Sequence, residues 1–218
     1  MLFSTTEENY IKAIFHLSEE GDESISTNSI AKAVNATAAS VTDMLKKLKQ
    51  KKIISYEKYH GVHLTKDGEK IAKGIIRKHR LWEVFLVEKL GYGWDKIHDI
   101  AEQLEHIHSD ELIDKLDKFL GYPRFDPHGD PIPDASGNIH SHKQKLLSEM
   151  SEGDGGKVLG VKDSSAKFLQ YLDSHNIQLG SEIEITGIVD FDGSFIIKLD
   201  KRKKATISKM AAQNIFIG

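Results

Sequence analysis

The chain has 218 residues, with 33 acidic and 30 basic side chains and no cysteine. The lack of cysteine excludes disulfides, thiolate nucleophiles and cysteine-based zinc or iron–sulfur sites, so a bound metal has to use oxygen and imidazole ligands. No run of about 18 apolar residues and no signal-like start is visible, which predicts a cytoplasmic protein without membrane contact. The net charge of −3 gives no overall indication of nucleic-acid binding, so that function has to rest on a local basic patch.

The first part of the chain predicts a DNA-binding domain. Three helices are indicated by apolar residues at helical spacing and by a tight turn between the second and the third: residues 5–20, 27–34 and 38–50. Two β-prone runs follow at residues 53–56 and 62–64, with a turn at His60-Gly61 between them. Helices followed by a two-stranded wing are the pattern of a winged helix-turn-helix, which we assign to residues 1–65.

The predicted helix at residues 38–50 carries the candidate DNA contacts. A recognition helix needs small or hydrogen-bonding side chains at its N-terminal end for base edges, and cations on its flanks for phosphates. Helix and wing together offer both kinds: Thr37, Ala39, Ser40, Thr42, Asp43, Lys46, Lys47, Lys58 and His60. The alternatives are a helical hairpin with a solvated lysine-rich face and a winged helix that binds only protein. The basic tip of the wing favours double-stranded DNA as the partner.

The middle of the chain predicts a helical domain. Thr65 is a suitable N-cap for a long helix that continues to about Leu90, and two shorter helices are indicated at residues 94–106 and 109–120. Apolar residues exceed what these helices can cover, which predicts a homodimer: Trp82, Val84, Phe85, Val87 and Leu90. Residues up to 142 contain all four prolines in an irregular connection, so the domain is assigned to residues 66–142.

The most informative cluster lies in the predicted helix at residues 94–106. Four metal-capable side chains share an arc of roughly 100° around the helix axis: His98, Glu102, Glu105 and His106. Between residues 97 and 114 acidic side chains stand without any Lys or Arg, an arrangement in which like charges repel. The alternative is a solvated acidic helix face. A second metal-capable pair, His79 and Glu83, favours a cation site.

The last part of the chain predicts a small β domain. Short strands at residues 183–189 and 194–199 flank a turn, and one helix is indicated at residues 165–174. We assign residues 150–218 to a small β-barrel. The expected fold class is therefore mainly α with small β parts.

The order of these parts resembles a known family. Its most specific motifs stand between the winged helix and the barrel: HRLWE at 79–83, HDIAEQLEH at 98–106 and PHGDPIP at 127–133. The chain resembles the metal-dependent repressors of the diphtheria toxin repressor and manganese transport regulator family, and the resemblance covers nearly its whole length. It implies a winged helix-turn-helix, a helical dimerisation and metal-binding domain, and a C-terminal SH3-like (FeoA-like) β-barrel.

The resemblance also implies two metal sites. The first draws on the acidic helix: Glu102, Glu105 and His106. Its further ligand comes from the first helix, where Asn9 stands at a position that usually holds Met or Asp, and Lys12 one turn on adds positive charge nearby. The second takes ligands from the helices, the proline loop and the barrel: His79, Glu83, His98, Asp126, His128 and Asp163. Roles without metal stay open for three of them: His128 as a loop residue, Asp163 as a helix cap and His98 as the polar neighbour of an aromatic ring.

By resemblance, the chain is a repressor of metal-uptake genes that binds operator DNA when loaded with Mn²⁺, or with Fe²⁺ as the alternative. Zn²⁺ or Co²⁺ would also bind such ligands by the general order of affinities. No enzymatic activity and no small organic substrate are expected. Two alternatives stay open. One is a di-metal carboxylate enzyme, because Glu105-x-x-His108 matches half of a di-iron motif, and the other is a winged-helix regulator that responds to an organic ligand.

Overall fold

The computed structural model describes residues 2–19, 25–57, 61–140 and 143–218. The chain folds into two compact units, each built from three separate stretches. The first comprises Met1–His79, Gln103–Glu111 and Pro133–Asn138, and the second comprises Arg80–Glu102, Leu112–Ile132 and Ile139–Gly218. Among the described residues, no helix is long and apolar enough to cross a membrane.

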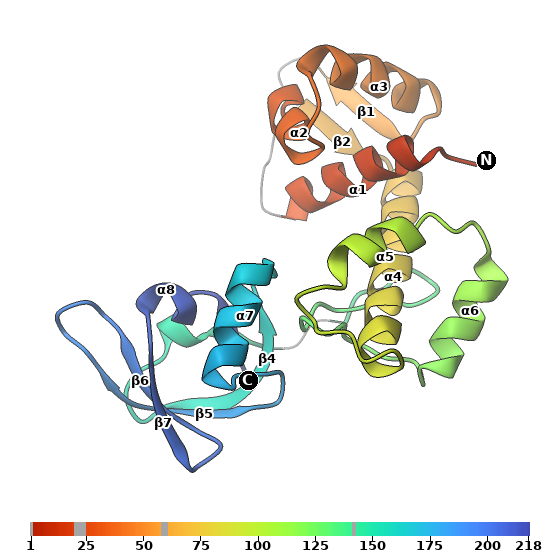
Figure 1. Ribbon diagram of the computed structural model, residues 1–218. Coiled ribbons are helices and arrows are strands. Elements are labelled where there is room, and N and C mark those ends of the chain that lie inside the picture. Colours follow the sequence, from red (N-terminus) through yellow and green to blue (C-terminus); the bar gives the residue numbers. More distant parts are fainter. Residues whose placement is uncertain (1, 20–24, 58–60, 141–142) are drawn as a thin grey trace. The chain divides into compact units, whose positions relative to one another are not determined.

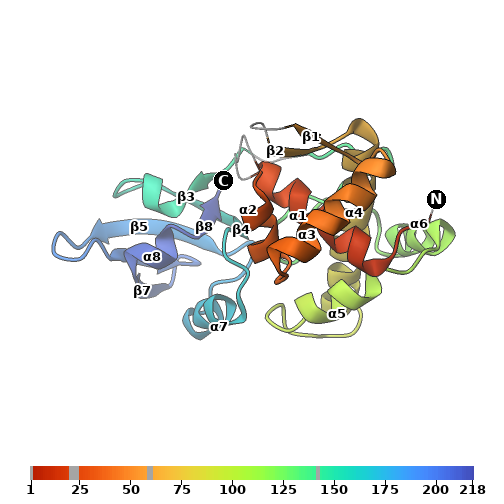
Figure 2. The same ribbon diagram turned by 90° about the horizontal axis from the view of Figure 1, so that it is seen from above.

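The first unit contains the predicted winged helix-turn-helix. Three helices precede a two-stranded antiparallel hairpin: α1 (Thr5–Glu19), α2 (Thr27–Ala33), α3 (Ala38–Gln50), β1 (Ile54–Glu57) and β2 (Gly61–Leu64). Figures 1 and 2 show these helices gathered beside the hairpin. Helix α3 begins at a side-chain cap, because Thr37 Oγ1 accepts a hydrogen bond of 3.2 Å from the backbone N–H of Ser40. The fold predicted for this part of the chain is confirmed.

Helix α3 has one buried and one exposed face, as a recognition helix requires. Val41 and Leu48 are fully buried, and Leu45 is nearly so. The candidate DNA contacts in the described ranges are all exposed: Thr37, Ala39, Ser40, Thr42, Asp43, Lys46 and Lys47. The remaining two candidates, Lys58 and His60, lie outside the described residues.

Helix α4 (Lys66–Glu88) starts directly after the wing. Thr65 caps it as predicted, because its Oγ1 accepts a hydrogen bond of 3.1 Å from the backbone N–H of Gly68. The same hydroxyl donates to the carbonyl oxygen of Lys52 at 2.9 Å, which ties the start of the helix to the start of the wing. Helix α4 is continuous across the boundary of the two units, which falls after His79.

The helix predicted at residues 94–106 is shorter in the structure. Two helices follow α4: α5 (His98–Leu104) and α6 (Asp110–Phe119). After Leu104 the chain tightens, because the N–H of Ile107 bonds to the carbonyl oxygen of Leu104, only three residues back. The prediction that four metal-capable side chains share one helix is therefore wrong for the last two of them. Glu105 and His106 stand in a turn after α5, and Glu105 is fully buried there.

The second unit contains the predicted C-terminal β domain. Six strands form one antiparallel sheet in the order β3-β8-β4-β5-β6-β7. Its elements are β3 (Lys145–Leu146), η1 (Leu147–Glu149), β4 (Gly155–Val161), α7 (Ala166–His175), β5 (Glu182–Ile188), β6 (Phe195–Leu199), β7 (Lys203–Ile207), α8 (Lys209–Ala212) and β8 (Ile215–Ile217). Leu169, Ile185 and Ile197 are fully buried in its core. The predicted β domain is confirmed, with a sheet whose edge strands β3 and β7 are not paired to each other in the described part of the chain.

The apolar residues that predicted self-association are partly covered within the chain. Val84 is 2% exposed, and Trp82 is half-buried against its neighbours. Of the same residues, Leu90 is 55% exposed, and further exposed apolar surface in the second unit is found on Phe119 and Tyr122, each 64% exposed. The homodimer stays a prediction.

The proline loop is held against the β domain within the second unit. The backbone N–H of Val161 donates a hydrogen bond of 2.9 Å to the carbonyl oxygen of His128. Gly129 has a φ of +89°, and a β-carbon on it would lie 2.1 Å from the carbonyl oxygen of Leu159. Glycine meets both requirements, so Gly129 permits the close approach that places His128.

We expect Gly129→Ala to lower the melting temperature of the protein more than Gly153→Ala does. Both glycines have a φ of +89°, but no atom lies within 4 Å of a β-carbon at Gly153. The control carries only the cost of a left-handed backbone, about 1–2 kcal/mol, whereas Gly129→Ala adds a clash with backbone. Thermal unfolding followed by circular dichroism measures the difference. Equal losses in the two variants would show that the close approach to Leu159 contributes nothing.

Candidate metal centre

Three buried side chains from two segments meet in the second unit. Glu83 belongs to α4, Asp126 and His128 belong to the proline loop, and the three are 2%, 4% and 4% exposed. One ligand atom of each lies within 4.8 Å of the other two. Metal–ligand bonds of about 2.0–2.2 Å place two ligand atoms of one ion at most about 4.4 Å apart, so a small inward movement suffices. The group fits a divalent cation with oxygen and imidazole ligands, and we call it the loop site.

His128 is oriented by contacts on its outer ring nitrogen. Its Nε2 lies 3.0 Å from the backbone carbonyl oxygen of Trp94, and the Trp94 ring stacks on the imidazole at a centroid distance of 6.3 Å. Its Nδ1 lies 3.7 Å from Glu83 Oε2. A carbonyl acceptor at one ring nitrogen keeps a proton there, so the other nitrogen is the one that can lose its proton and act as a ligand. Nδ1 is therefore the atom available to a cation.

Asp126 is held through both of its carboxylate oxygens. Its Oδ1 accepts backbone hydrogen bonds from His128 at 2.8 Å and from Asp130 at 3.0 Å. Its Oδ2 lies 3.5 Å from Arg80 Nε. Arg80 in turn donates to the carbonyl oxygen of Pro131, at 2.5 Å. These contacts shape the corner of the loop before any cation binds.

Burial and charge move two pKa values of the loop site towards protonation. Burial is the largest influence on Asp126 and, with the carboxylates of Asp130 and Glu83, it raises the pKa to about 7 against the opposing charges of Arg80 and His128. Burial alone would lower the pKa of His128, but the Glu83 carboxylate outweighs it and raises the pKa to about 9. Near neutral pH, protons therefore occupy the atoms that a cation would bind.

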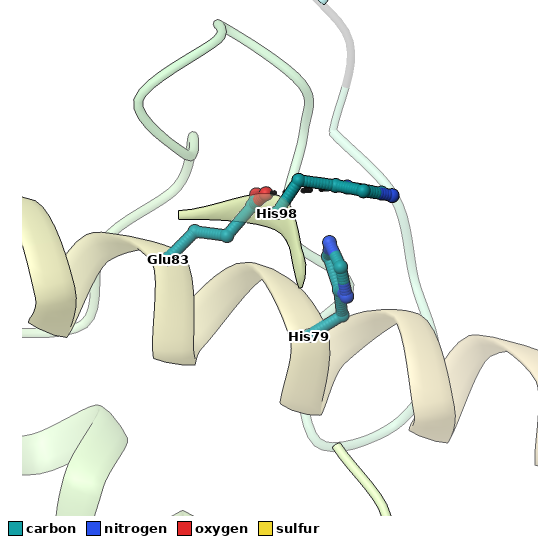
Figure 3. A group of neighbouring side chains, drawn as sticks. All are labelled: His79, Glu83 and His98. Carbon is teal, nitrogen blue, oxygen red and sulfur yellow. Dashed lines mark ion pairs between the residues drawn. The ribbon is translucent and has the colours of Figure 1, made fainter. Parts of the chain in front are cut away.

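His98, on α5, approaches Glu83 at its other oxygen. Its Nδ1 lies 3.9 Å from Glu83 Oε1, and its Nε2 lies 3.6 Å from Glu102 Oε1. Figure 3 shows His98 beside Glu83, with His79 one turn before Glu83 on α4. The side chain of His98 is 60% exposed. It is therefore the solvent-facing member among the predicted ligands around Glu83.

A second group of buried charges surrounds Glu105 in the first unit. Lys12 Nζ lies 2.7 Å and 2.8 Å from the two carboxylate oxygens of Glu105. His79 Nδ1 lies 2.6 Å from Oε2 of the same carboxylate. Burial opposes the ionisation of Glu105, but His79 and Lys12 outweigh it and hold the pKa of Glu105 below its ordinary value. Glu105 is an ionised carboxylate that already has a cation as its partner.

Glu8, next to the predicted Asn9, is the first-helix residue that contacts His106. His106 Nδ1 lies 2.5 Å from Glu8 Oε2, and Lys78 Nζ lies 3.8 Å from Glu8 Oε1. Asn9 Oδ1 is buried without a hydrogen-bond partner in the part of the chain that the structure describes. Metal ligation by Asn9 stays a prediction.

Asp163 has a local partner in the β domain. It is exposed, and its Oδ1 accepts a hydrogen bond of 2.8 Å from the backbone N–H of Ser165, the residue that caps α7. This contact agrees with the alternative that Asp163 supports the start of a helix. Its role as a metal ligand stays a prediction.

Sequence reasoning missed several contributors to these groups, among them Arg80, Glu8 and Lys78. Arg80 was not singled out, although it stands in HRLWE beside two candidate ligands. Glu8 was not singled out because a helical pattern does not tell which of two adjacent residues meets a distant segment. A positive charge inside a ligand-rich motif is a signal that could have identified Arg80.

We expect the affinity of the loop site for Mn²⁺ to rise with pH. Asp126 is protonated below about pH 7 and His128 below about pH 9, and ligands have to lose these protons to bind a metal. Each displaced proton makes the affinity rise by up to about tenfold per pH unit below its pKa. Calorimetry in buffers of different ionisation enthalpy measures the protons released, with Asp126→Asn as the variant that removes the lower step. A pH-independent affinity without proton release would contradict the assignment.

Three family models match consecutive parts of the chain. The N-terminal DNA binding domain of iron dependent repressors matches residues 2–62, and their metal binding and dimerisation domain matches residues 65–134. A FeoA domain matches residues 145–218. Together they follow the order of parts described above.

Known proteins agree with these matches. The chain is 34% identical to a solved manganese-dependent transcriptional repressor in complex with manganese, with a TM-score of 0.84 over 97% of this chain and 98% of that one. It is 30% identical to the iron-dependent repressor IdeR of Mycobacterium leprae over 84% of this chain and 80% of that protein. It is 32% identical to the diphtheria toxin repressor of Corynebacterium jeikeium over 59% of this chain, and the match spans 53%, about half, of that relative. The chain belongs to the iron-dependent repressor family, the metal-dependent transcriptional repressors that include the diphtheria toxin repressor.

Proposed function

We propose that this chain is a cytoplasmic, homodimeric repressor of metal-uptake genes that binds operator DNA when the loop site holds a divalent cation. The observation that carries the proposal is the buried set of two carboxylates and one imidazole at Glu83, Asp126 and His128. The exposed face of α3 in the same chain supports the DNA-binding part. The proposed functional domains are residues 1–65, 66–142 and 150–218.

The donor set supports Mn²⁺ as the cation, with Fe²⁺ as the alternative. Carboxylate oxygens suit Mn²⁺, and the chain has no cysteine that would favour softer ions. Imidazole also suits iron, and Zn²⁺ or Co²⁺ would bind in vitro at least as tightly by the general order of affinities. The relatives support both ions, since one is described as a complex with manganese and another is named iron-dependent.

A bound cation would supply the positive charge that draws Glu83 towards Asp126 and His128. The carbonyl oxygen of Trp94 and the N–H of Val161 hold His128 in place, so the loop is the prepared partner and α4 is the element that responds. Helix α4 runs without a break from the end of the wing to Glu83. A more ordered C-terminal half of α4 would therefore bias which conformations the winged domain adopts. Metal control acts in this way through populations rather than through contact with DNA.

Helix α3 offers exposed groups for both kinds of DNA contact. Ser40 and Thr42 present hydroxyl groups near its N-terminal end, where a recognition helix meets base edges. Lys46 Nζ lies 3.0 Å from Asp43 Oδ1, and the two side chains are 68% and 72% exposed. An ion pair so exposed is weak, so a phosphate group can replace it. The basic face of α3 is available for the DNA backbone.

The alternative of a di-metal carboxylate enzyme has less support. Di-iron carboxylate proteins use Glu-x-x-His on facing helices, whereas Glu105 stands in a turn and His108 lies beyond it. The other instance, Glu57 to His60, falls in the wing and ends outside the described residues. We therefore propose no catalytic activity and no small organic substrate. A winged-helix regulator of an organic ligand is not favoured by any contact described above.

Fluorescence anisotropy tests the function on duplexes taken from upstream of metal-transporter genes in the genome that encodes the chain. We expect binding with Mn²⁺ to be at least about tenfold tighter than binding with a chelator, a coupling of about 1.4 kcal/mol or more. In Glu83→Gln the Mn²⁺ effect should be lost, while the control Glu88→Gln, exposed at the end of the same helix, should keep it. Equal affinity with and without metal in the unmodified chain would refute metal control, and no binding at all would favour the protein-interaction alternative.

Lys47→Ala should weaken binding to all duplex sequences and reduce the slope of log K against log salt by about one. Lys47 is exposed on α3, and its removal deletes one phosphate contact without touching the buried face. Lys167→Ala on α7, also exposed, is the matched control. Anisotropy titrations at several salt concentrations measure both slopes. If Lys47→Ala and Lys167→Ala shifted the slope equally, α3 would not be the DNA-binding face.

A further inference from the structure

We propose that the ammonium group of Lys12 takes the place of a metal ion at Glu105, so that each chain binds one divalent cation, at the loop site. Six residues of the first unit form what we call the Lys12 junction: Glu8, Lys12, Lys78, His79, Glu105 and His106. The family resemblance implies a metal site at Glu105 and His106, but in this chain an ammonium group already contacts both carboxylate oxygens of Glu105. The inference depends on the proposed function in one respect only: it takes the loop site as the site that binds the cation.

The first argument is the space around Glu105. Lys12 Nζ contacts both carboxylate oxygens, at 2.7 and 2.8 Å. The Lys12 and Glu105 side chains are 12% and 0% exposed. A metal ion bonded to either oxygen at about 2.0–2.2 Å would overlap the ammonium group or lie directly against its charge. Moving Lys12 away would break a mostly buried ion pair, which is strongly unfavourable.

The second argument is the use of the histidine nitrogens. His79 Nδ1 lies 2.6 Å from Glu105 Oε2, and His106 Nδ1 lies 2.5 Å from Glu8 Oε2. A carboxylate accepts hydrogen bonds, so each Nδ1 carries the proton and its lone pair is not available to a metal. The two nitrogens that form hydrogen bonds with the carboxylates of the junction therefore act as donors.

The third argument is the balance of fixed charge. Each carboxylate of the junction has one lysine as a partner, because Lys12 Nζ lies 2.7 Å from Glu105 Oε1 and Lys78 Nζ lies 3.8 Å from Glu8 Oε1. Histidines also lie near both, since His106 Nε2 is 3.9 Å from Glu105 Oε1 and His108 Nδ1 is 3.7 Å from Glu8 Oε1. Two carboxylates and two ammonium groups cancel, and the neutral amide of Asn9 adds no negative charge. A divalent cation would bring two uncompensated charges into this buried group.

The loop site has the opposite balance. Three carboxylates lie around one guanidinium group there, since Arg80 is 3.5 Å from Asp126 and 3.8 Å from Asp130, with Glu83 beside His128. With Asp126 and His128 deprotonated, as metal binding requires, the excess of negative charge attracts a divalent cation. Of the two buried groups, the loop site is therefore the one that exchanges a metal and the Lys12 junction is a permanent ion-pair cluster.

Metal stoichiometry of the full chain tests the proposal, with Mn²⁺ alone as the probe in calorimetry and in elemental analysis after desalting. We expect about one Mn²⁺ per chain in the unmodified protein and in Glu105→Gln, and the Mn²⁺ affinities of these two proteins should agree within about twofold. Glu83→Gln should bind no Mn²⁺. Lys12→Arg keeps a cation at Glu105 and should also bind about one Mn²⁺. Lys12→Met removes the ammonium group from Glu105, so it should bind about two.

Lys12→Met is expected to have a lower melting temperature that added Mn²⁺ raises more than in the unmodified protein, because the second ion replaces the lost cation. If Lys12→Met does not fold, the unmodified protein and Glu105→Gln decide between the alternatives. Two Mn²⁺ per chain with loss of one in Glu105→Gln would overturn the proposal. A failure of the proposed function looks different: one Mn²⁺ would bind at the loop site, but operator binding would not respond to it.

Discussion

The structure depends on positive charge for carboxylates that folding has removed from water. Glu105, Glu83 and Asp126 are 0%, 2% and 4% exposed, and a buried carboxylate is tolerated only when it is paired or protonated. The chain meets this requirement in two ways. An ammonium group from α1 neutralises Glu105, whereas the loop site relies on protons and one shared guanidinium group. Under the proposed function, a metal ion that binds the loop site from solution can signal its own concentration. Lys12 cannot, because it is part of the chain and always present.

The loop site draws its residues from elements that lie far apart in the sequence. Glu83 lies on the helix that begins at the wing, and His128 lies in a loop whose backbone bonds to β4 through Val161. The β domain thus contributes to the loop site by holding the backbone of His128, and the close approach at Gly129 makes that contact possible. The Trp94 carbonyl, which would not itself contact a cation, orients the imidazole of His128 through a hydrogen bond.

The chain belongs to the iron-dependent repressor family, but this membership does not fix the charges at the two candidate metal positions. A family match transfers the architecture, but ligand sets transfer only residue by residue. Here the α1 position facing Glu105 carries Lys12, and the neighbouring Glu8 binds His106. The balance of charges within each buried group therefore distinguishes the two candidate metal positions better than the number of acidic residues in either one.

The sequence by itself determined the winged helix, the exposed face of α3, the cap at Thr65 and the restriction to oxygen and imidazole ligands, because caps, turns and periodicity are local properties of the chain. It also grouped Glu83, Asp126 and His128 through the family resemblance. Only the tertiary structure decided that α5 ends before Glu105, and that Lys12 reaches a carboxylate 93 residues away. Partners so far apart in the sequence are chosen by the packing of helices and loops, which no local pattern records.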